Sequence, residues 1–225
     1  MATTVTIAAG VEGLGVGIVE ATAIRLGPSG EALNQYKHDV VRRTLTEGMH
    51  GGEERRAAVR QLLRAGGYRP AGRNKPAQEY LLRTIAEQAA LPDILNAVDL
   101  INAVSLDCGL PISLISLTRG GPQLELRYGR PGESYTFNRA GQDLDLAGLI
   151  CVCGAGSDTP LGTPVKDSLL GKVADGDERV VACIYAPRAA VNADELREWA
   201  DRLGHGMVEW CGAASCSISL VPDSW

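Results

Sequence analysis

Hydrophobic and polar positions between residues 31 and 111 recur with the spacing of helices. Apolar residues three and four apart predict helices over about 31–47, over about 53–65 and over the segment that follows Pro76, which suits a first helical turn. The inner face of that third helix is expected to carry Tyr80, Leu81, Leu82, Ile85 and Ala89. The glycines of GMHGG separate the first two helices, and Leu91-Pro92 closes the third.

The segment NAVDLINAVSLDCGLP, residues 96–111, predicts a fourth helix with an unusual polar line. Asn96, Asp99 and Asn102 lie three apart within an otherwise apolar run, so they share one side of a helix that must be buried. Buried amides and carboxylates are costly without hydrogen-bond partners. Two interpretations follow: the polar groups connect parts of the core through nearby backbone, or they border a ligand cavity.

After Pro111 the pattern changes to short strands. They are expected in ISLISL, QLELRYG, ESYTF, AGLICVCG and ERVVACIYA, with turns at GGP, RPGE and DGDE. A last helix over about Ala193 to Leu203 follows, with Asn192 as its N-cap. Near the N-terminus, residues 5–7 and 16–24 read as strands that form a hairpin or a sheet edge. This order predicts an α+β fold with a mostly antiparallel sheet flanked by helices.

Length and composition are those of a globular protein with an aliphatic core. The chain has 225 residues, of which 4% are aromatic, so Leu, Val, Ile and Ala must fill the interior. We divide it into an N-terminal extension of strands and basic helices, residues 1–67, packed on a main domain, residues 68–225. No apolar run is long enough to span a membrane, and MATTVTIAAG lacks the features of a secretory signal. We therefore expect a cytoplasmic protein without a membrane partner.

Positive charge is concentrated in one segment although the net charge is -5. Between Arg42 and Arg83 there are ten Lys or Arg residues against four Glu, a local balance of +6. Arg56, Arg60 and Arg64 recur every four residues and form a basic stripe if the segment is helical; Arg69, Arg73 and Lys75 follow in a loop. The stripe can bind phosphates, or it is an ordinary solvated helix face partly neutralised by Glu53 and Glu54.

The residues do not show the motifs of the common metal and nucleotide sites. The six cysteines have apolar flanks and unsuitable spacings, and the three histidines are scattered, so we expect reduced structural thiols and neither a metal nor a cofactor. GxSxG, the Walker phosphate loop and HExxH are absent. Hydrolysis by this chain would therefore depend on a water molecule oriented by polar side chains and backbone amides.

Four segments together resemble a known family. They are YRPAGRNKPAQEYLLRTI, LPDILNAVDLINAVSLDCGLPI, QLELRYGRPGE and VKDSLLGKVADGDERVVACIYA. They are similar to the B3/B4 tRNA-editing domain of the phenylalanyl-tRNA synthetase β subunit, and more closely to its free-standing relatives. The resemblance covers roughly residues 68 to 210. It implies a B3/B4-like domain with an N-terminal strand and helix extension.

The resemblance implies hydrolysis of the ester bond of a mischarged aminoacyl-tRNA. The implied catalytic residues, which position substrate and water, are Asn96, Asn102 and Ser168. The implied substrate-binding residues are Asp99, Ser105, Arg127, Glu133, Lys166 and Asp167. The backbone amides at 154–157 would stabilise the oxyanion, and the neighbouring ribose hydroxyl would assist. The tRNA acceptor stem would lie along Arg56, Arg60, Arg64, Arg69, Arg73 and Lys75.

Three classes of function follow, with tRNA rather than DNA as the expected nucleic-acid partner. The first is translation quality control by an aminoacyl-tRNA deacylase acting in trans. The second is a non-catalytic module that binds tRNA or a small ligand; the absence of tryptophan from GAGSDTPLGTPVKDSLLGKV, where many free-standing relatives have a tryptophan- and arginine-rich turn, favours it. The third is a structural partner of a synthetase or of a ribosome factor.

Overall fold

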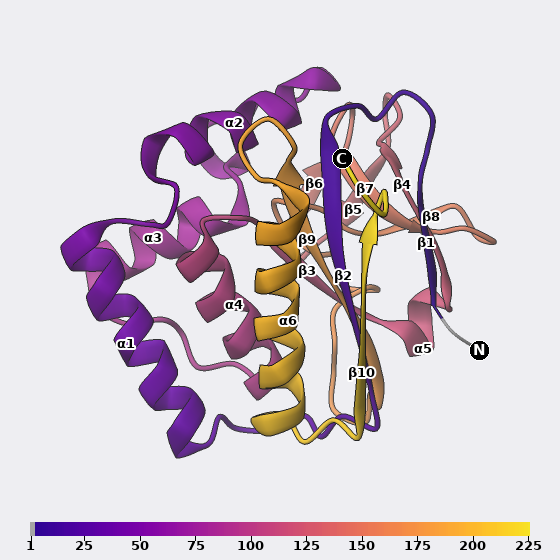
Figure 1. Ribbon diagram of the computed structural model, residues 1–225. Coiled ribbons are helices and arrows are strands. Elements are labelled where there is room, and N and C mark those ends of the chain that lie inside the picture. Colours follow the sequence, from indigo (N-terminus) through magenta and orange to yellow (C-terminus); the bar gives the residue numbers. More distant parts are fainter. Residues whose placement is uncertain (1–2) are drawn as a thin grey trace.

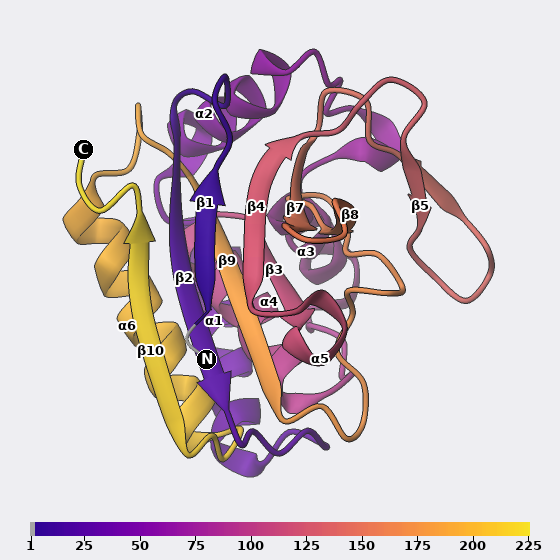
Figure 2. The same ribbon diagram turned by 90° about the vertical axis from the view of Figure 1, so that its right-hand side faces the viewer.

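The computed structural model describes residues 3–225 and consists of three layers, a helical layer and two four-stranded sheets (Figures 1 and 2). The helix-side sheet has the order β10 (Ser215–Val221), β2 (Leu14–Thr22), β9 (Arg179–Pro187), β3 (Ile112–Ser116). The outer sheet has the order β1 (Thr4–Ile7), β4 (Gln123–Tyr128), β7 (Ile150–Gly154), β8 (Thr159–Gly162). Every strand pair in the two sheets is antiparallel except β1 with β4.

The helices cover the face of the helix-side sheet that points away from the outer sheet (Figure 1). They are α1 (Glu31–Glu47), α2 (Gly52–Ala65), α3 (Ala77–Gln88), α4 (Asn96–Cys108) and α6 (Ala193–Glu209). Shorter elements are the 3-10 turn η1 (Gly72–Asn74), the helical turn α5 (Leu117–Gly120), and the hairpin of β5 (Ser134–Thr136) and β6 (Asp143–Asp145). Among the described residues, no helix has both the length and the apolar character that crossing a bilayer requires.

Two large apolar clusters hold the layers together. Between the sheets, Tyr185 of β9 packs with Leu126 of β4 and Val152 of β7. On the other face of β9, Ala182 packs with Leu100 of α4 and Leu203 of α6. Because neighbouring residues of β9 point into different clusters, this strand is buried on both faces and reads as a continuous apolar run. A smaller cluster joins α1, α3 and α4.

The fold class predicted from the sequence is confirmed, and several elements are corrected. The structure is α+β with mostly antiparallel pairing, and Asn192 caps α6 by accepting the backbone N–H of Glu195 at 2.8 Å. Of the two alternatives for the N-terminal strands, the hairpin is wrong, since β1 and β2 belong to different sheets, and β1 lies at a sheet edge. The last helix continues to Glu209, and the strands β6, β8 and β10 were not predicted. Met1 and Ala2, where the predicted N-terminal extension starts, lie outside the described residues.

Pairing links the predicted extension to residues near the other end of the chain. In β2, Val19 pairs with Ala182 of β9 on one side and with Ile218 of β10 on the other. All but the last residue of β2 is buried. The segment 1–67 therefore supplies an interior strand of the helix-side sheet.

Candidate functional site

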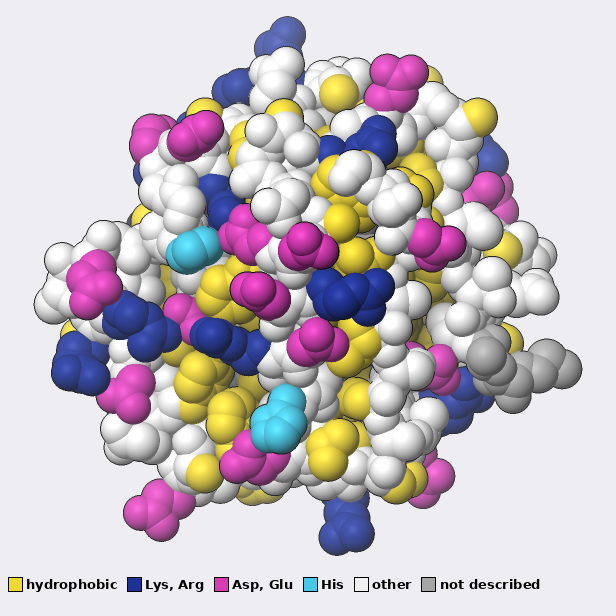
Figure 3. All heavy atoms as spheres, viewed as in Figure 1, with side chains coloured by type: hydrophobic (Ala, Val, Ile, Leu, Met, Phe, Trp, Pro, Cys, Tyr) yellow, Lys and Arg dark blue, Asp and Glu magenta, His cyan; other side chains and the backbone are white. Residues whose placement is uncertain are grey.

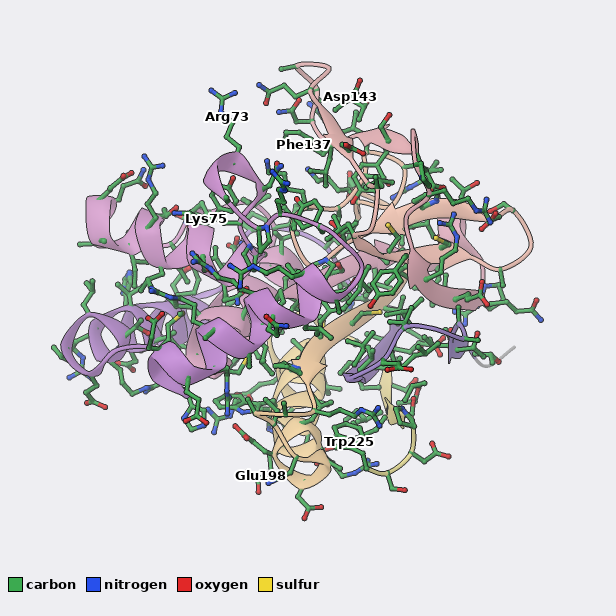
Figure 4. All side chains as sticks on the ribbon, turned by 90° about the horizontal axis from the view of Figure 1, so that it is seen from above. Arg73, Lys75, Phe137, Asp143, Glu198 and Trp225 are labelled. Carbon is green, nitrogen blue, oxygen red and sulfur yellow. The ribbon has the colours of Figure 1, made fainter. Side chains whose placement is uncertain are left out.

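Three segments that are distant in the sequence border an open cleft of about 640 Å³, here called the Phe137 cleft. They are η1 with the start of α3, the β5–β6 hairpin, and the loop that follows β8. The lining residues are Arg73, Asn74, Tyr80, Arg83, Phe137, Gln142, Asp143, Leu144 and Lys166. Figure 4 shows Arg73, Phe137 and Asp143 gathered at one side of the molecule, far from Glu198 on α6.

The loop after β8 brings Lys166 to this cleft through a small hydrogen-bond cluster. The Thr163 hydroxyl donates to the carbonyl oxygen of Lys166 at 2.8 Å and accepts the backbone N–H of Lys166 at 3.1 Å. The Tyr135 hydroxyl, from β5, also contacts that carbonyl oxygen. Because both the donor and the acceptor of the Lys166 backbone are bonded, its side chain is held toward the hairpin and α3.

The Lys166 ammonium lies against two aromatic rings. It is 4.2 Å from the ring centroid of Phe137 and 5.3 Å from that of Tyr80. It donates one hydrogen bond, at 3.2 Å, to the carbonyl oxygen of Arg73. Burial, followed by the positive charges of Arg73 and Lys172, lowers the pKa of Lys166 from its ordinary value of 10.5. The cleft therefore combines aromatic faces with an excess of positive charge.

The next residue, Asp167, turns its carboxylate into the protein. Its Oδ2 accepts the backbone N–H of Leu114 at 3.1 Å, while its Oδ1 is inaccessible to solvent and has no hydrogen-bond partner among the described residues. Burial raises the pKa of Asp167 to about 6. The neighbouring hydroxyls of Ser113 and Tyr185 are 2.9 Å apart and bonded to each other. The carboxylate thus lies behind the cleft and does not line it.

Ser168, a predicted catalytic residue, holds its own loop closed. Its hydroxyl donates to the carbonyl oxygen of Leu161 at 2.8 Å and accepts the backbone N–H of Gly171 at 2.9 Å. The side chain is buried. Its hydroxyl proton is thus committed to a structural bond.

The predicted polar line of α4 is used largely by neighbouring loops. Asn96 donates to the carbonyl oxygen of Arg25 at 2.8 Å and accepts the backbone N–H of Gly27 at 3.2 Å. Asp99 accepts the hydroxyl of Ser29 at 2.6 Å, the backbone N–H of Ile94 at 2.9 Å and the ammonium of Lys37 at 3.2 Å. A hollow of about 360 Å³ beside Pro28 and Ile94 reaches Asp99, whose oxygens are all engaged.

Asn102 and Ser105, both on α4, differ in the hydrogen bonding of their side chains. Asn102 is half-buried, and its amide makes no side-chain hydrogen bond to another described residue. The Ser105 hydroxyl donates to the carbonyl oxygen of Leu110 at 2.6 Å, across the left-handed Gly109 that ends the helix. The three predicted catalytic side chains of Asn96, Asn102 and Ser168 make no hydrogen bond to one another.

Arg127 and Glu133, both predicted to bind substrate, form an ion pair with each other. The guanidinium donates to both oxygens of Glu133, at 2.8 and 2.7 Å, and to Asp158 at 2.7 Å. This hydrogen bonding lowers the pKa of Glu133 below its ordinary value and raises that of Arg127. Arg127 is buried, so the arrangement fastens the turns after β4 and β7 and leaves no donor directed at a ligand.

The backbone amides predicted to form an oxyanion site are also largely engaged. Ala155 donates its N–H to the carbonyl oxygen of Gln123 at 2.9 Å, and Ser157 donates to that of Gly154 at 3.1 Å. These bonds build the β7–β8 turn. These backbone N–H groups therefore stabilise the turn itself.

The predicted basic stripe of α2 is only partly available. Arg60 makes two hydrogen bonds with the buried Glu79 of α3, at 2.6 and 2.5 Å, and Arg56 pairs with Glu53 at 2.6 Å. Exposed positive charge remains at three predicted positions, Arg64, Arg69 and Arg73, while Lys75 is half-buried. Figure 3 shows that the face over α1 and α6 mixes Lys and Arg with Asp and Glu.

The structure thus brings together two predicted residues from different groups, Arg73 and Lys166, and adds residues that the sequence analysis did not select. Phe137 is the one phenylalanine of the chain and lies at a predicted strand end beside a turn, which is a usable signal. Tyr80 was placed on the inner face of its helix, but it is half-buried, lines the cleft and contacts the carbonyl oxygen of Arg73.

No model of a known protein family matches this chain, and no curated protein matches it.

Proposed function

We propose that this protein binds the acceptor end of a mischarged aminoacyl-tRNA at the Phe137 cleft and hydrolyses its ester bond. The observation that carries the proposal is the meeting of Arg73 and Lys166 beside two aromatic rings in a cavity large enough for a nucleotide. Exposed Arg64 and Arg69 extend positive charge away from the cleft. The resemblance to B3/B4 domains supplies the reaction, which the geometry alone does not define.

In the proposed reaction, water adds to the ester carbonyl carbon and the bond to the ribose oxygen breaks. The leaving oxygen takes up a proton, and the products are the free amino acid and uncharged tRNA. None of the three predicted catalytic side chains lines the Phe137 cleft. Asn102 is the one whose amide makes no side-chain hydrogen bond to another described residue, and on the strength of the resemblance it is the residue we propose to orient the water.

The test is a deacylation assay with a panel of mischarged tRNAs. Wild-type protein should accelerate release of the amino acid from at least one of them. Asn102→Ala should lose at least roughly tenfold in kcat/KM, about 1.4 kcal/mol of transition-state stabilisation, with an unchanged circular dichroism spectrum. Arg197→Ala, which removes an exposed cation from α6, is the control and should behave as wild type.

A second candidate function is binding without hydrolysis. It is favoured by the engagement of the Asn96 and Ser168 side chains, and of the amides of Ala155 and Ser157, in structural hydrogen bonds. Stoichiometric binding of tRNA with no release of amino acid from any member of the panel would establish this function and exclude the first.

A further inference from the structure

The two aromatic rings of the Phe137 cleft come from different elements and face a common space. Phe137 directly follows the β5 strand and Tyr80 lies in the first half of α3, and the Lys166 ammonium is within 5.3 Å of both ring centroids. Apart from these ring contacts, the Lys166 ammonium makes one hydrogen bond within the described part of the chain, to the Arg73 carbonyl oxygen. A flat ring entering the cleft can displace this flexible side chain outward and take its place against the aromatic faces.

Positive charge at the cleft exceeds what the protein neutralises. The Arg73 side chain is exposed and pairs with no carboxylate among the described residues. Lys172 donates to the carbonyl oxygen of Phe137 at 2.6 Å, and the one carboxylate that lines the cleft, Asp143, already accepts the Thr136 hydroxyl at 2.6 Å. Arg73 and Lys166 against the single carboxylate of Asp143 leave a net positive charge, which favours an anionic ligand.

Two side-chain amides also line the cleft. Asn74 belongs to η1 and Gln142 to the hairpin turn. The Gln142 Oε1 accepts the Asn138 side-chain amide at 2.8 Å, so the two Gln142 amide hydrogens point away from Asn138. Such groups can bond the edge of a ring that lies between them.

Resting on the proposed function, we infer that the Phe137 cleft is a subsite for an unpaired nucleotide at an RNA 3′ end. Its base would lie against Phe137 and Tyr80, and its phosphate would contact Arg73 and Lys166. Stacking requires an unpaired base, which a duplex does not offer. A long duplex would also need a continuous cationic face, and Arg56 and Arg60 are neutralised by Glu53 and Glu79.

The test uses two fluorescein-labelled RNA hairpins that share one stem. One ends bluntly, and the other carries four unpaired nucleotides at its 3′ end. In fluorescence anisotropy titrations of the full chain, the extended hairpin should bind at least roughly tenfold more tightly than the blunt one. Adenosine monophosphate should compete for the cleft more strongly than inorganic phosphate at the same concentration.

Two variants distinguish the contribution of the aromatic ring to RNA binding from that of the positive charge. Phe137→Leu keeps an apolar side chain for packing but removes the aromatic face, and should abolish most of the preference for the extended hairpin. Lys166→Met keeps the length of the stem and removes the charge, and should reduce the slope of log affinity against log salt by about 0.7. Arg197→Ala is the matched control for loss of a cation. Thermal melting curves identify any variant that fails to fold.

Equal binding of the two hairpins, or wild-type preference in a folded Phe137→Leu variant, would overturn the subsite. Equal competition by inorganic phosphate would do the same. These outcomes are distinct from failure of the proposed function. Hydrolysis of mischarged tRNA by Phe137→Leu at the wild-type rate would reject the subsite alone, whereas hairpin preference without hydrolysis would support the subsite and reject the reaction.

Discussion

At the scale of single residues, Lys166 and Asp167 show how adjacent positions take opposite roles. The backbone between them is fixed by Thr163 and Tyr135, so one charged side chain is directed to the cleft and the other to the interior. Burial of an ionised carboxylate with one oxygen unbonded lowers stability. The chain thus carries a destabilising charge directly behind the proposed binding site.

Asp167→Asn should therefore stabilise the protein at neutral pH. The pKa of Asp167 is raised to about 6 by burial, so the folded state favours the protonated form. Wild-type stability from this group is full below the unfolded pKa near 4 and is lost as pH rises to about 6. The variant should gain up to about 3 kcal/mol above pH 6 and less below it.

Urea denaturation of the wild type and of Asp167→Asn across this pH range measures the difference. Asp201→Asn, at an exposed position of α6, is the control and should follow the wild-type profile. A stability difference that stays constant between pH 4 and pH 7 would contradict the assignment.

Glu133→Gln should have the opposite effect and destabilise the protein at neutral pH. Hydrogen bonding to Arg127 lowers the pKa of Glu133, so its contribution is present above the unfolded pKa and is lost as pH falls through the folded value. Glu133 retains some solvent exposure, so we expect a loss of about 1 kcal/mol at pH 7 that disappears in acid. Chemical denaturation at pH 7 and pH 3 tests this, with exposed Glu198→Gln as the control.

At the scale of elements, helix α4 organises loops at both of its ends. Asn96 and Asp99 hold the segments before α1 and before α4 itself, and Ser105 holds the turn into β3. The side chains that looked most suited to a ligand in the sequence are those that position the layers. The same residue types serve both purposes, because a buried polar group needs partners whether these come from a loop or a ligand.

Asp99→Ala should be strongly destabilising. It leaves the buried Lys37 with the exposed Asp93 as its remaining acidic partner and removes the acceptors of Ser29 and Ile94. We expect a loss of about 3 kcal/mol in the free energy of unfolding. Asp39→Ala on the exposed side of α1 is the matched control and should leave the unfolding midpoint nearly unchanged. Similar midpoints for the two variants would show that the Asp99 contacts contribute little.

Much of this level of structure could be predicted from the sequence, because periodicity reflects burial directly. The helices and most strands follow their hydrophobic patterns. Strand β10 was not predicted because SCSISLV alternates serine with apolar residues on an exposed edge, and β8 was not predicted because TPLG is short and contains proline. The partners of Asp99 and Arg60 could not be predicted, since Lys37 and Glu79 are brought near them only by tertiary packing.

At the scale of the whole molecule, the two sheets join the ends of the chain. Strand β2 lies between β9 and β10, and β1 lies beside β4 of the other sheet (Figure 2). The sequence predicts the α+β class but not this division into two sheets, because strand patterns do not specify which strands pair. The Phe137 cleft could not be predicted either, because three segments that are distant in the sequence form it.

A fragment of residues 68–225 should therefore fail to fold. Without β2, strands β9 and β10 lose their shared neighbour and the apolar residues Val16, Ile18 and Val19 leave both clusters. Deletion of residues 1–9 is the control, because it removes only the edge strand β1. Far-ultraviolet circular dichroism with thermal melting should show a cooperative transition for the control and none for the fragment. A cooperative transition in the fragment would mean that 68–225 folds by itself.

The position of β2 also governs how the protein forms during synthesis. Thr22 pairs with Arg179 and with Ser215, so a strand made early on the ribosome waits for neighbours that emerge only when translation is almost finished. Such sequence-distant pairing slows folding. In the meantime the nascent chain presents an apolar strand with both edges open, which makes premature termination before β10 a direct route to aggregation.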